Sequence, residues 1–158
     1  MTSDHCSLET VTVRRVTTDD APIVANLVKA LFNELRDGAM VPQYRSESIS
    51  DVLAETERSF GLLALDGSRA IGVLMLTEAV AIFAGGIFGQ ITELYVMPDF
   101  RSQGVAAMLV KSAAELGRAR GWKRMDVGAP HQPRWSRSLN FYRSEGFVEV
   151  GPRLRLDL

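Results

Sequence analysis

Cysteine is nearly absent from this 158-residue chain, in which Cys6 is the only one. A single thiol excludes an internal disulfide, so nothing in the sequence indicates an oxidising compartment. Cys6 and its neighbour His5 are too few ligands for a tetrahedral zinc site, because His131 is the only other histidine. We therefore expect no metal site, and we interpret residues 1–9 as a flexible N-terminus.

The sequence also lacks an excess of one charge and a long apolar run. Lys and Arg number 18 against 19 Asp and Glu, a net charge of −1, whereas a dedicated nucleic-acid binder needs a basic excess. No uninterrupted apolar run approaches the roughly 20 residues of a membrane span. The polar, acidic start predicts no secretory signal. We expect no nucleic-acid or membrane partner and a cytoplasmic location.

What is present is the composition of a globular domain. Hydrophobic residues make up 46% and charged residues 23% of the chain, which argues against wholesale disorder. A chain of this length buries about two thirds of its unfolded surface in one core. Because no repeat, low-complexity tract or linker divides it, the sequence predicts a single domain over residues 1–158.

The pattern of apolar residues predicts a mixed α/β fold. Helical spacing predicts helices at 22–37, 49–53, 104–121 and 136–145, the first ending at the stop signal Asp37-Gly38. Apolar and β-branched runs between turn signals predict strands at 11–16, 60–65, 70–83, 87–96, 123–127, 147–150 and 153–158. Loops are expected at 38–47 and 131–134. The middle of the chain is therefore expected to form an antiparallel meander.

The stretch QITELYVMPDFRSQGVAA, residues 90–107, predicts a site for a phosphate or diphosphate. A strand leads through a proline turn into a loop with Gly104, where the long helix begins. The first N–H groups of a helix have no intrahelical acceptor and carry partial positive charge, so they bind anions. Gly104 permits close approach of the backbone, Ala106 keeps the first turn narrow, and Arg101 adds charge. Neither G-x-G-x-x-G nor G-x-x-x-x-G-K-[ST] is present, which disfavours a dinucleotide or nucleoside triphosphate.

The surroundings of this loop resemble the GCN5-related N-acetyltransferase (GNAT) superfamily. The matching residues are Glu93-Leu94-Tyr95-Val96, Pro98, Arg101-Ser102-Gln103-Gly104-Val105-Ala106, Phe141-Tyr142 and Gly146-Phe147. The order of elements fits from Val11 to Leu158. The resemblance implies a mostly antiparallel central sheet of about seven strands with a splayed parallel pair, flanked by about four helices. It also implies acetyl-CoA as co-substrate and favours a homodimer.

The resemblance assigns the co-substrate contacts to two segments. A loop that matches Arg101, Ser102, Gln103, Gly104, Val105 and Ala106 wraps the diphosphate of acetyl-CoA in the family, mainly through backbone amides. A bulged strand that matches Leu94, Tyr95 and Val96 splays from the next parallel strand and pairs with the pantetheine arm. A strand edge suits an amide-rich ligand, and a bulge leaves N–H groups free to stabilise an oxyanion.

The implied reaction is attack of a primary amine on the acetyl thioester, which requires that a base or a water chain first deprotonate the ammonium. Glu93 resembles the strand-borne glutamate that serves as base in part of the family, and the alternative is a surface carboxylate on a half-exposed strand. Tyr142 resembles the tyrosine that protonates the departing thiolate, and the alternative is core packing beside Phe141. Whether Glu93 acts directly or through water stays open.

Two positions depart from the family pattern N-x-x-A-x-x-F-Y. Trp135 stands at the asparagine and Ser138 at the alanine, so the usual side-chain hydrogen bond to the co-substrate is not implied. Asn140 lies five residues too late to replace it. Trp135 is expected to pack on the co-substrate, to line the acceptor pocket or to pack in the core.

The resemblance also implies that the acceptor site is built largely from the first two helices and their connecting loop, about residues 30 to 55. Four carboxylates are candidates to attract a cationic amine, with a solvated face as the alternative because Arg36 and Arg45 lie among them: Glu34, Asp37, Glu47 and Asp51. The short chain without a basic arm favours a small-molecule amine, while a protein lysine or N-terminus and a longer acyl-CoA remain alternatives. A non-catalytic acyl-CoA sensor, in which Glu93 and Tyr142 are dispensable, is the rival of another class.

Overall fold

The computed structural model describes residues 10–35, 46–129 and 135–158. Within these residues one sheet has the strands β1 (Val11–Arg15), β2 (Ser59–Asp66), β3 (Arg69–Ala81), β4 (Gly86–Val96) and β5 (Met125–Val127), in that order. The first four pair antiparallel, and β5 pairs parallel to β4. The helices are α1 (Ala21–Leu35), α2 (Ser46–Ala54), α3 (Val105–Arg120) and α4 (Ser136–Ser144). The predicted mixed α/β fold is thus confirmed.

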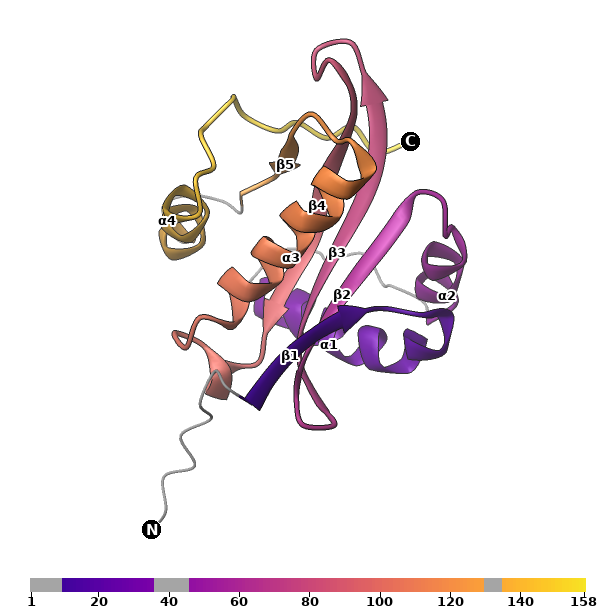
Figure 1. Ribbon diagram of the computed structural model, residues 1–158, viewed down its shortest axis with the longest axis vertical. Helices are drawn as coiled ribbons and strands as arrows, with labels where there is room; N and C mark the ends of the chain where they lie inside the picture. Colours follow the sequence, from indigo (N-terminus) through magenta and orange to yellow (C-terminus); the bar gives the residue numbers. More distant parts are fainter. Residues whose placement is uncertain (1–9, 36–45, 130–134) are drawn as a thin grey trace.

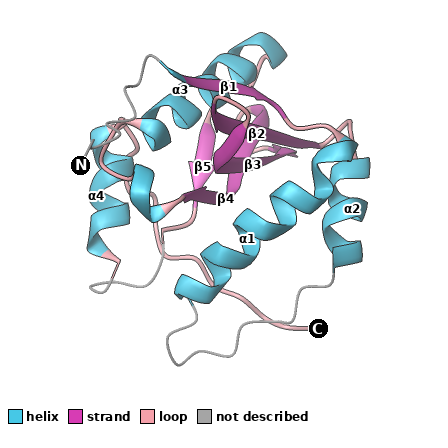
Figure 2. Ribbon diagram, turned by 90° about the horizontal axis from the view of Figure 1, so that it is seen from below, coloured by secondary structure: helices cyan, strands magenta, loops and turns pink. Residues whose placement is uncertain are grey.

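Helices cover both faces of the sheet, with α1 and α2 on one side and α3 on the other (Figures 1 and 2). Side chains alternate across a strand, so neighbouring residues of β2 enter different cores. Leu62 packs in the core under α3, whereas Leu63 packs in the core under α1 and α2. Both side chains are buried, which explains why β2 reads as a continuous apolar run rather than as an alternating one.

A bulge in β4 reverses this alternation before the strand ends. Met75 of β3 pairs with Glu93, but the next residue, Leu76, pairs with Ile91, so Thr92 is an extra residue. Ile91 belongs to the core under α3, whereas Tyr95 belongs to the core under α1. Glu93 shares a face with Tyr95 and lies opposite Met75, so the bulge turns the Glu93 side chain toward α1.

The same bulge marks the point where the sheet opens. The pairing of β4 with β5 covers only Gly89 with Met125, Gln90 with Asp126 and Ile91 with Val127. From Glu93 to Val96, β4 stays paired with β3 but has no strand partner on its other side among the described residues. The splayed parallel pair that the family resemblance implies is therefore present.

The two predicted C-terminal strands are a correction. No strand follows β5 in the described residues, so the sheet has five strands there rather than about seven. Residues 148–158 are exposed, and their apolar members, which alternate as in a strand, contact neither core. Alternation specifies a strand only where a strand edge and an apolar face receive it, and this segment meets neither.

Smaller differences concern ends of elements. The turn predicted at 66–69 is confirmed, with Gly67 at a φ of 59° between β2 and β3. The helix α2 begins at Ser46, inside the predicted loop, and β5 begins two residues later than predicted. The predictions for residues 1–9, the stop signal Asp37-Gly38, most of the loop 38–47 and the loop 131–134 lie outside the described residues.

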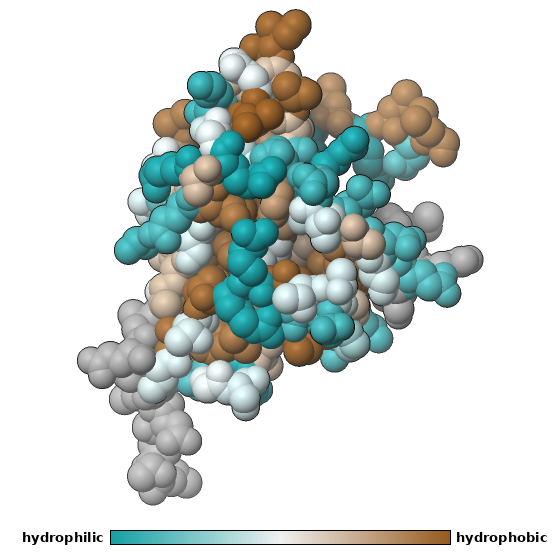
Figure 3. Space-filling model, turned by 45° about the vertical axis from the view of Figure 1, so that its right-hand side comes forward, coloured by the Kyte–Doolittle hydropathy of each residue, from teal (hydrophilic) through white to brown (hydrophobic). Residues whose placement is uncertain are grey.

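The hairpin of β3 and β4 projects beyond the rest of the sheet (Figure 1). Its tip carries apolar side chains that are largely exposed, namely Val80, Ile82 and Phe83. Apolar side chains accordingly lie at the top of the molecule in Figure 3, among more polar ones. At the base of the tip, Phe83 contacts Phe88 edge to face with ring centroids 5.5 Å apart, and the Arg124 guanidinium lies over the Phe83 ring.

Candidate active site

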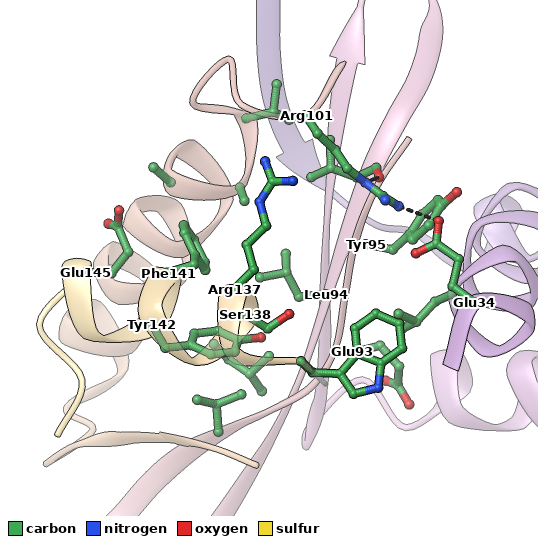
Figure 4. A pocket seen from close by; sticks show the side chains of 18 of the residues that line it. Glu34, Glu93, Leu94, Tyr95, Arg101, Arg137, Ser138, Phe141, Tyr142 and Glu145 are labelled. Carbon is green, nitrogen blue, oxygen red and sulfur yellow. Dashed lines mark hydrogen bonds and ion pairs between the residues drawn. The ribbon is translucent and has the colours of Figure 1, made fainter. Parts of the chain in front are cut away.

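A cleft of about 770 Å³ lies where β4 and β5 separate. Its walls include Leu31 and Glu34 of α1, on one face of the sheet, and Val105 and Ala106 of α3, on the other. It therefore passes through the sheet at the split, and α4 closes the side that β5 leaves open (Figure 4). A volume of this size is typical of small-molecule sites.

The N-terminus of α3 opens on this cleft. The turn Pro98–Phe100 brings the chain out of β4, and the buried Phe100 ring fixes it to the core. Gly104, with a φ of 83°, directly precedes the helix, and Ser102 also has a positive φ, at 61°. The first N–H bonded to a carbonyl at this end is that of Met108, which donates to the carbonyl of Gly104. Among the described backbone hydrogen bonds, the N–H groups of residues 102–107 have no carbonyl acceptor, so they can bind an anion.

Arg101 lines the cleft, and its guanidinium is bound by groups outside the loop. Its Nε donates to the carbonyl of Val96 at 2.8 Å, and its Nη2 donates to Oε1 of Glu34 at 2.6 Å. The guanidinium also lies 5.4 Å from the ring centre of Tyr95. Arg101 therefore points toward α1 and is neutralised there (Figure 4).

The other predicted loop residues divide into two groups. Ser102, Gly104, Val105 and Ala106 line the cleft, as do Leu94, Tyr95 and Val96 of β4. Gln103 does not line it, because its side-chain amide turns back and donates to the carbonyl of Asp99 at 3.1 Å. Its side-chain oxygen is buried with no hydrogen-bond partner.

Glu93 enters the cleft from β4 with a carboxyl whose pKa is shifted. Burial raises the pKa of Glu93 above its usual value, and a hydrogen bond from the Thr92 hydroxyl to Oε2, at 2.5 Å, offsets part of this effect. A carboxylate with a raised pKa holds a proton more tightly than an exposed one does. The environment of Glu93 therefore favours a general base.

Tyr142 enters the cleft from α4, across from Glu93 (Figure 4). Burial raises the pKa of its phenol to about 12, so the hydroxyl keeps its proton throughout the neutral range. The ring contacts Phe141 and Phe147, with ring centres 5.3 Å and 5.5 Å away. Tyr142 thus packs against its neighbours and also presents a hydroxyl donor to the cleft.

Arg137 is a cleft residue that the sequence interpretation missed. It lies in the first turn of α4, and its Nη2 donates to the hydroxyl of Ser102 at 2.5 Å. A single arginine near a helix start carries no sequence signal for this role, because the contact joins residues 35 positions apart. Trp135 and Ser138 also line the cleft, whereas Asn140 does not.

Of the carboxylates predicted to attract the acceptor, only some lie at the cleft. Glu34 lines the cleft, but its carboxylate is paired with Arg101. Glu47 and Asp51, on α2, are exposed and lie outside the cleft lining, and Asp37 is not among the described residues.

Within the described ranges no three His, Cys, Asp or Glu side chains are grouped to hold a metal ion, and no helix is long and apolar enough to cross a bilayer.

Comparison with known proteins defines the class of this fold and cleft. Residues 26–147 match the family model of the acetyltransferase (GNAT) family. An uncharacterized N-acetyltransferase from Archaeoglobus fulgidus is 30% identical over 124 residues, which cover 77% of this chain and 67% of that protein. The chain belongs to the acetyltransferase (GNAT) family.

Solved structures of the same fold include acetyltransferases that are named for different acceptors. An aminoglycoside acetyltransferase from an uncultured soil metagenomic sample, solved in complex with sisomicin, superposes with a TM-score of 0.78 at 17% identity over 95% of this chain and 97% of that one. A ribosomal-protein-alanine N-acetyltransferase from Brucella melitensis superposes with a TM-score of 0.74 at 20% identity over 94% and 99%. At these identities the likeness extends to the fold alone.

Proposed function

We propose that this protein transfers the acetyl group of acetyl-CoA to a primary amine of a small molecule. The observation that carries the proposal is the cleft through the split sheet, with the N-terminus of α3 opening on it and Glu93 and Tyr142 entering from two sides. Membership of the acetyltransferase family supports the reaction class. The acceptor and the co-substrate are inferred from the residues of the cleft.

The donor set of the cleft fits the two polar parts of acetyl-CoA. The free N–H groups ahead of Met108 suit a diphosphate, since they combine hydrogen-bond donors with the positive end of α3. The open edge of β4 over Leu94–Val96 suits the amides of a pantetheine arm, because that edge has backbone groups without a strand partner. When bound, acetyl-CoA supplies an acetyl group activated as a thioester.

Two side chains act on the reacting groups, Glu93 as a base and Tyr142 as a hydrogen-bond donor. Only a neutral amine has a lone pair for attack, and Glu93 accepts the proton of the acceptor ammonium, directly or through a water molecule. Tyr142 donates a hydrogen bond toward the leaving sulfur. With a pKa of about 12 the phenol is a weaker acid than a thiol. Its contribution is therefore a stabilising donor rather than complete loss of its proton.

A small cationic amine fits the acceptor half of the cleft. This half lies beside α1, where the carboxylates of Glu34 and Glu93 line the wall together with Leu31 and Leu35. The ion pair of Glu34 with Arg101 leaves Glu93 as the carboxylate of this half that has no cation partner among the described residues, while Glu145 lines the cleft from beyond the end of α4. A polyamine, an aminoglycoside or an amino acid ester presents the ammonium that such a wall attracts.

An acetyl-transfer assay over a panel of amines tests the proposal. Purified protein, acetyl-CoA and each amine are mixed, and released coenzyme A is followed with a thiol reagent, against which the one cysteine of the chain gives at most one equivalent of background. The panel contains polyamines, aminoglycosides, amino acid esters and short peptides with free N-termini. Turnover with a small amine supports the proposal, and turnover with peptides alone indicates a protein acetyltransferase. Binding of coenzyme A without turnover by any amine indicates a sensor and refutes the enzyme.

We also propose that two copies associate through the exposed apolar side chains of residues 148–158. This segment carries Val148, Val150, Leu154, Leu156 and Leu158, each at least 73% exposed. Because the segment alternates as a strand does, a second copy is an occupant that offers the same pattern in return. Sedimentation of the full chain and of a chain that ends at residue 147 tests this. A monomeric full chain contradicts it.

A further inference from the structure

The positive charge nearest the loop ahead of α3 does not come from the loop itself. Arg101 is the one arginine or lysine in the loop, and its guanidinium is held by Glu34, the carbonyl of Val96 and the face of Tyr95. These contacts direct it toward α1. A diphosphate carries at least two negative charges, and backbone N–H groups supply only partial positive charge. The site therefore needs a cation from elsewhere in the fold.

Arg137 meets this need from α4. Its side chain rises from the first turn of α4 toward the N-terminal end of α3 and lies within the cleft (Figure 4). Its Nη2 is bonded to the Ser102 hydroxyl, and none of the described carboxylates pairs with it. The second arginine of α4, Arg143, differs in both respects, because it is paired with Glu149 at 2.9 Å and lies outside the cleft lining.

We infer that Arg137 binds the diphosphate of the co-substrate and thereby fixes α4, with Tyr142, against the N-terminus of α3. This inference rests on the proposed function. A planar guanidinium presents several N–H donors at once, so it can hold Ser102 and a phosphate oxygen together. One ligand group then contacts both the N-terminal end of α3 and α4. Among the described residues, the hydrogen bond from Arg137 to Ser102 is the one that links α4 to the loop ahead of α3.

The same contact acts on Tyr142 through the helix. Arg137 and Tyr142 lie about one and a half turns apart on α4, so a helix held at Arg137 also holds the phenol. Arg137 is thus a positioning residue for Tyr142 as well as a ligand for the diphosphate. Diphosphate binding prepares the donor side of the cleft before the acceptor amine reacts.

Titration calorimetry with two probes tests the ligand role. The probes are coenzyme A and dephospho-coenzyme A, which share the diphosphate and differ in the 3′-phosphate. Arg137→Gln should weaken the binding of both about tenfold, and Arg137→Lys should restore part of the loss, because it keeps the charge and loses the fork. Arg143→Gln, on the same helix, is the matched control and should bind both probes as the unaltered chain does.

Hydrogen exchange of α4 tests the positioning role without relying on activity. Coenzyme A should protect the amides of residues 138–144 in the unaltered chain and in Arg143→Gln, and the protection at saturating ligand should be clearly smaller in Arg137→Gln. In the free proteins the exchange of this helix should be the same in all three. A faster exchange of free Arg137→Gln would show a structural role in the fold and would overturn the inference.

Further outcomes separate this inference from the function on which it rests. Equal affinity of Arg137→Gln and the unaltered chain for both probes would overturn the inference and leave the proposed function standing. A loss seen with coenzyme A but not with dephospho-coenzyme A would assign Arg137 to the 3′-phosphate instead and would also overturn it. If the unaltered chain bound neither probe, the proposed function would fall, and the inference with it.

Discussion

Gly117 lies on the buried face of α3, directly against the indole of Trp122. A β-carbon at this position would stand 2.5 Å from Cε3 of Trp122, and one on Gly89 of β4 would stand closer still to the same ring. Two glycines therefore admit the indole between helix and sheet. The ring is held there by a hydrogen bond from its Nε1 to Glu78 and by an edge contact with Phe60.

Gly117→Ala sets two effects of opposite sign against each other. Alanine in place of glycine in a helix interior is worth about 1 kcal/mol of stability. Overpacking against a fixed ring costs about 1–3 kcal/mol. The contact distance lies well inside the range where an atom must shift, and backbone and aromatic ring both resist that shift. We expect the overpacking to prevail, with a net loss of about 1 kcal/mol in the free energy of unfolding.

The sign should invert when the indole is removed. In a Trp122→Leu background the added methyl has space, so Gly117→Ala should stabilise the chain by about 1 kcal/mol, a coupling of about 2 kcal/mol between the two positions. Urea unfolding followed by far-ultraviolet circular dichroism measures all four chains and does not depend on the indole. Ala119→Gly, on the exposed face of α3, measures the difference in helix propensity between alanine and glycine without any contact to Trp122. A stabilising Gly117→Ala in the unaltered chain would refute this account of Trp122.

Three further predictions concern ionisable or polar side chains. Glu93→Gln should lower kcat about a hundredfold if Glu93 is the base. The melting temperature at pH 7 should stay equal or rise, because burial opposes the charge that glutamine lacks. In the unaltered enzyme kcat should rise with pH as Glu93 loses its proton. Tyr142→Phe should lower kcat at least tenfold while the coenzyme A dissociation constant stays within about twofold, and an unchanged kcat would remove Tyr142 from the mechanism. Asp20 is bonded to Arg14 and to the Thr17 backbone, and these bonds lower its pKa to about 2. Asp20→Asn should therefore cost about 1–2 kcal/mol at pH 7, after discounting for the half-exposed Arg14. The bonded form is the carboxylate, so the difference in unfolding free energy between the two chains should persist above about pH 4 and shrink as the pH falls toward 2. Urea unfolding at pH 7 and pH 3 measures this difference, and equal values at the two pH values would contradict the prediction.

The order of helices and strands was predictable because burial in the two cores gives helices and strands different patterns of apolar residues. Helical spacing in α1 and α3 and apolar runs in β2, β3 and β4 all follow from burial against a neighbouring layer. The loop ahead of α3 was predictable as well, since Gly104 adopts the left-handed backbone that glycine favours. These features are local, and each depends on a few adjacent residues.

The features that the sequence did not reveal depend on distant partners. The extra residue Thr92 is a bulge only by virtue of its register with Met75 and Leu76. Arg101 turns away from the anion site because Glu34, 67 positions earlier, holds it. The segment 153–158 alternates as a strand does, yet it lies against no strand edge in the described fold. In each case the local pattern was compatible with two outcomes, and a tertiary contact or its absence selected one.

The split in the sheet matters more to the proposed chemistry than any one side chain of the cleft. A continuous sheet would keep Glu93, which faces α1, on the opposite side from α3 and α4, with a full backbone layer between base and donor. The bulge at Thr92 turns Glu93 toward α1, and the departure of β5 after Ile91 opens a passage beside it. Under the proposed function, an acceptor that enters beside α1 would meet, in this gap, a thioester held beside α3 and α4. In the proposed reaction a base on one face would serve the attacking nitrogen and a donor from the other the leaving sulfur, which is possible because the two strands part where the bulge occurs.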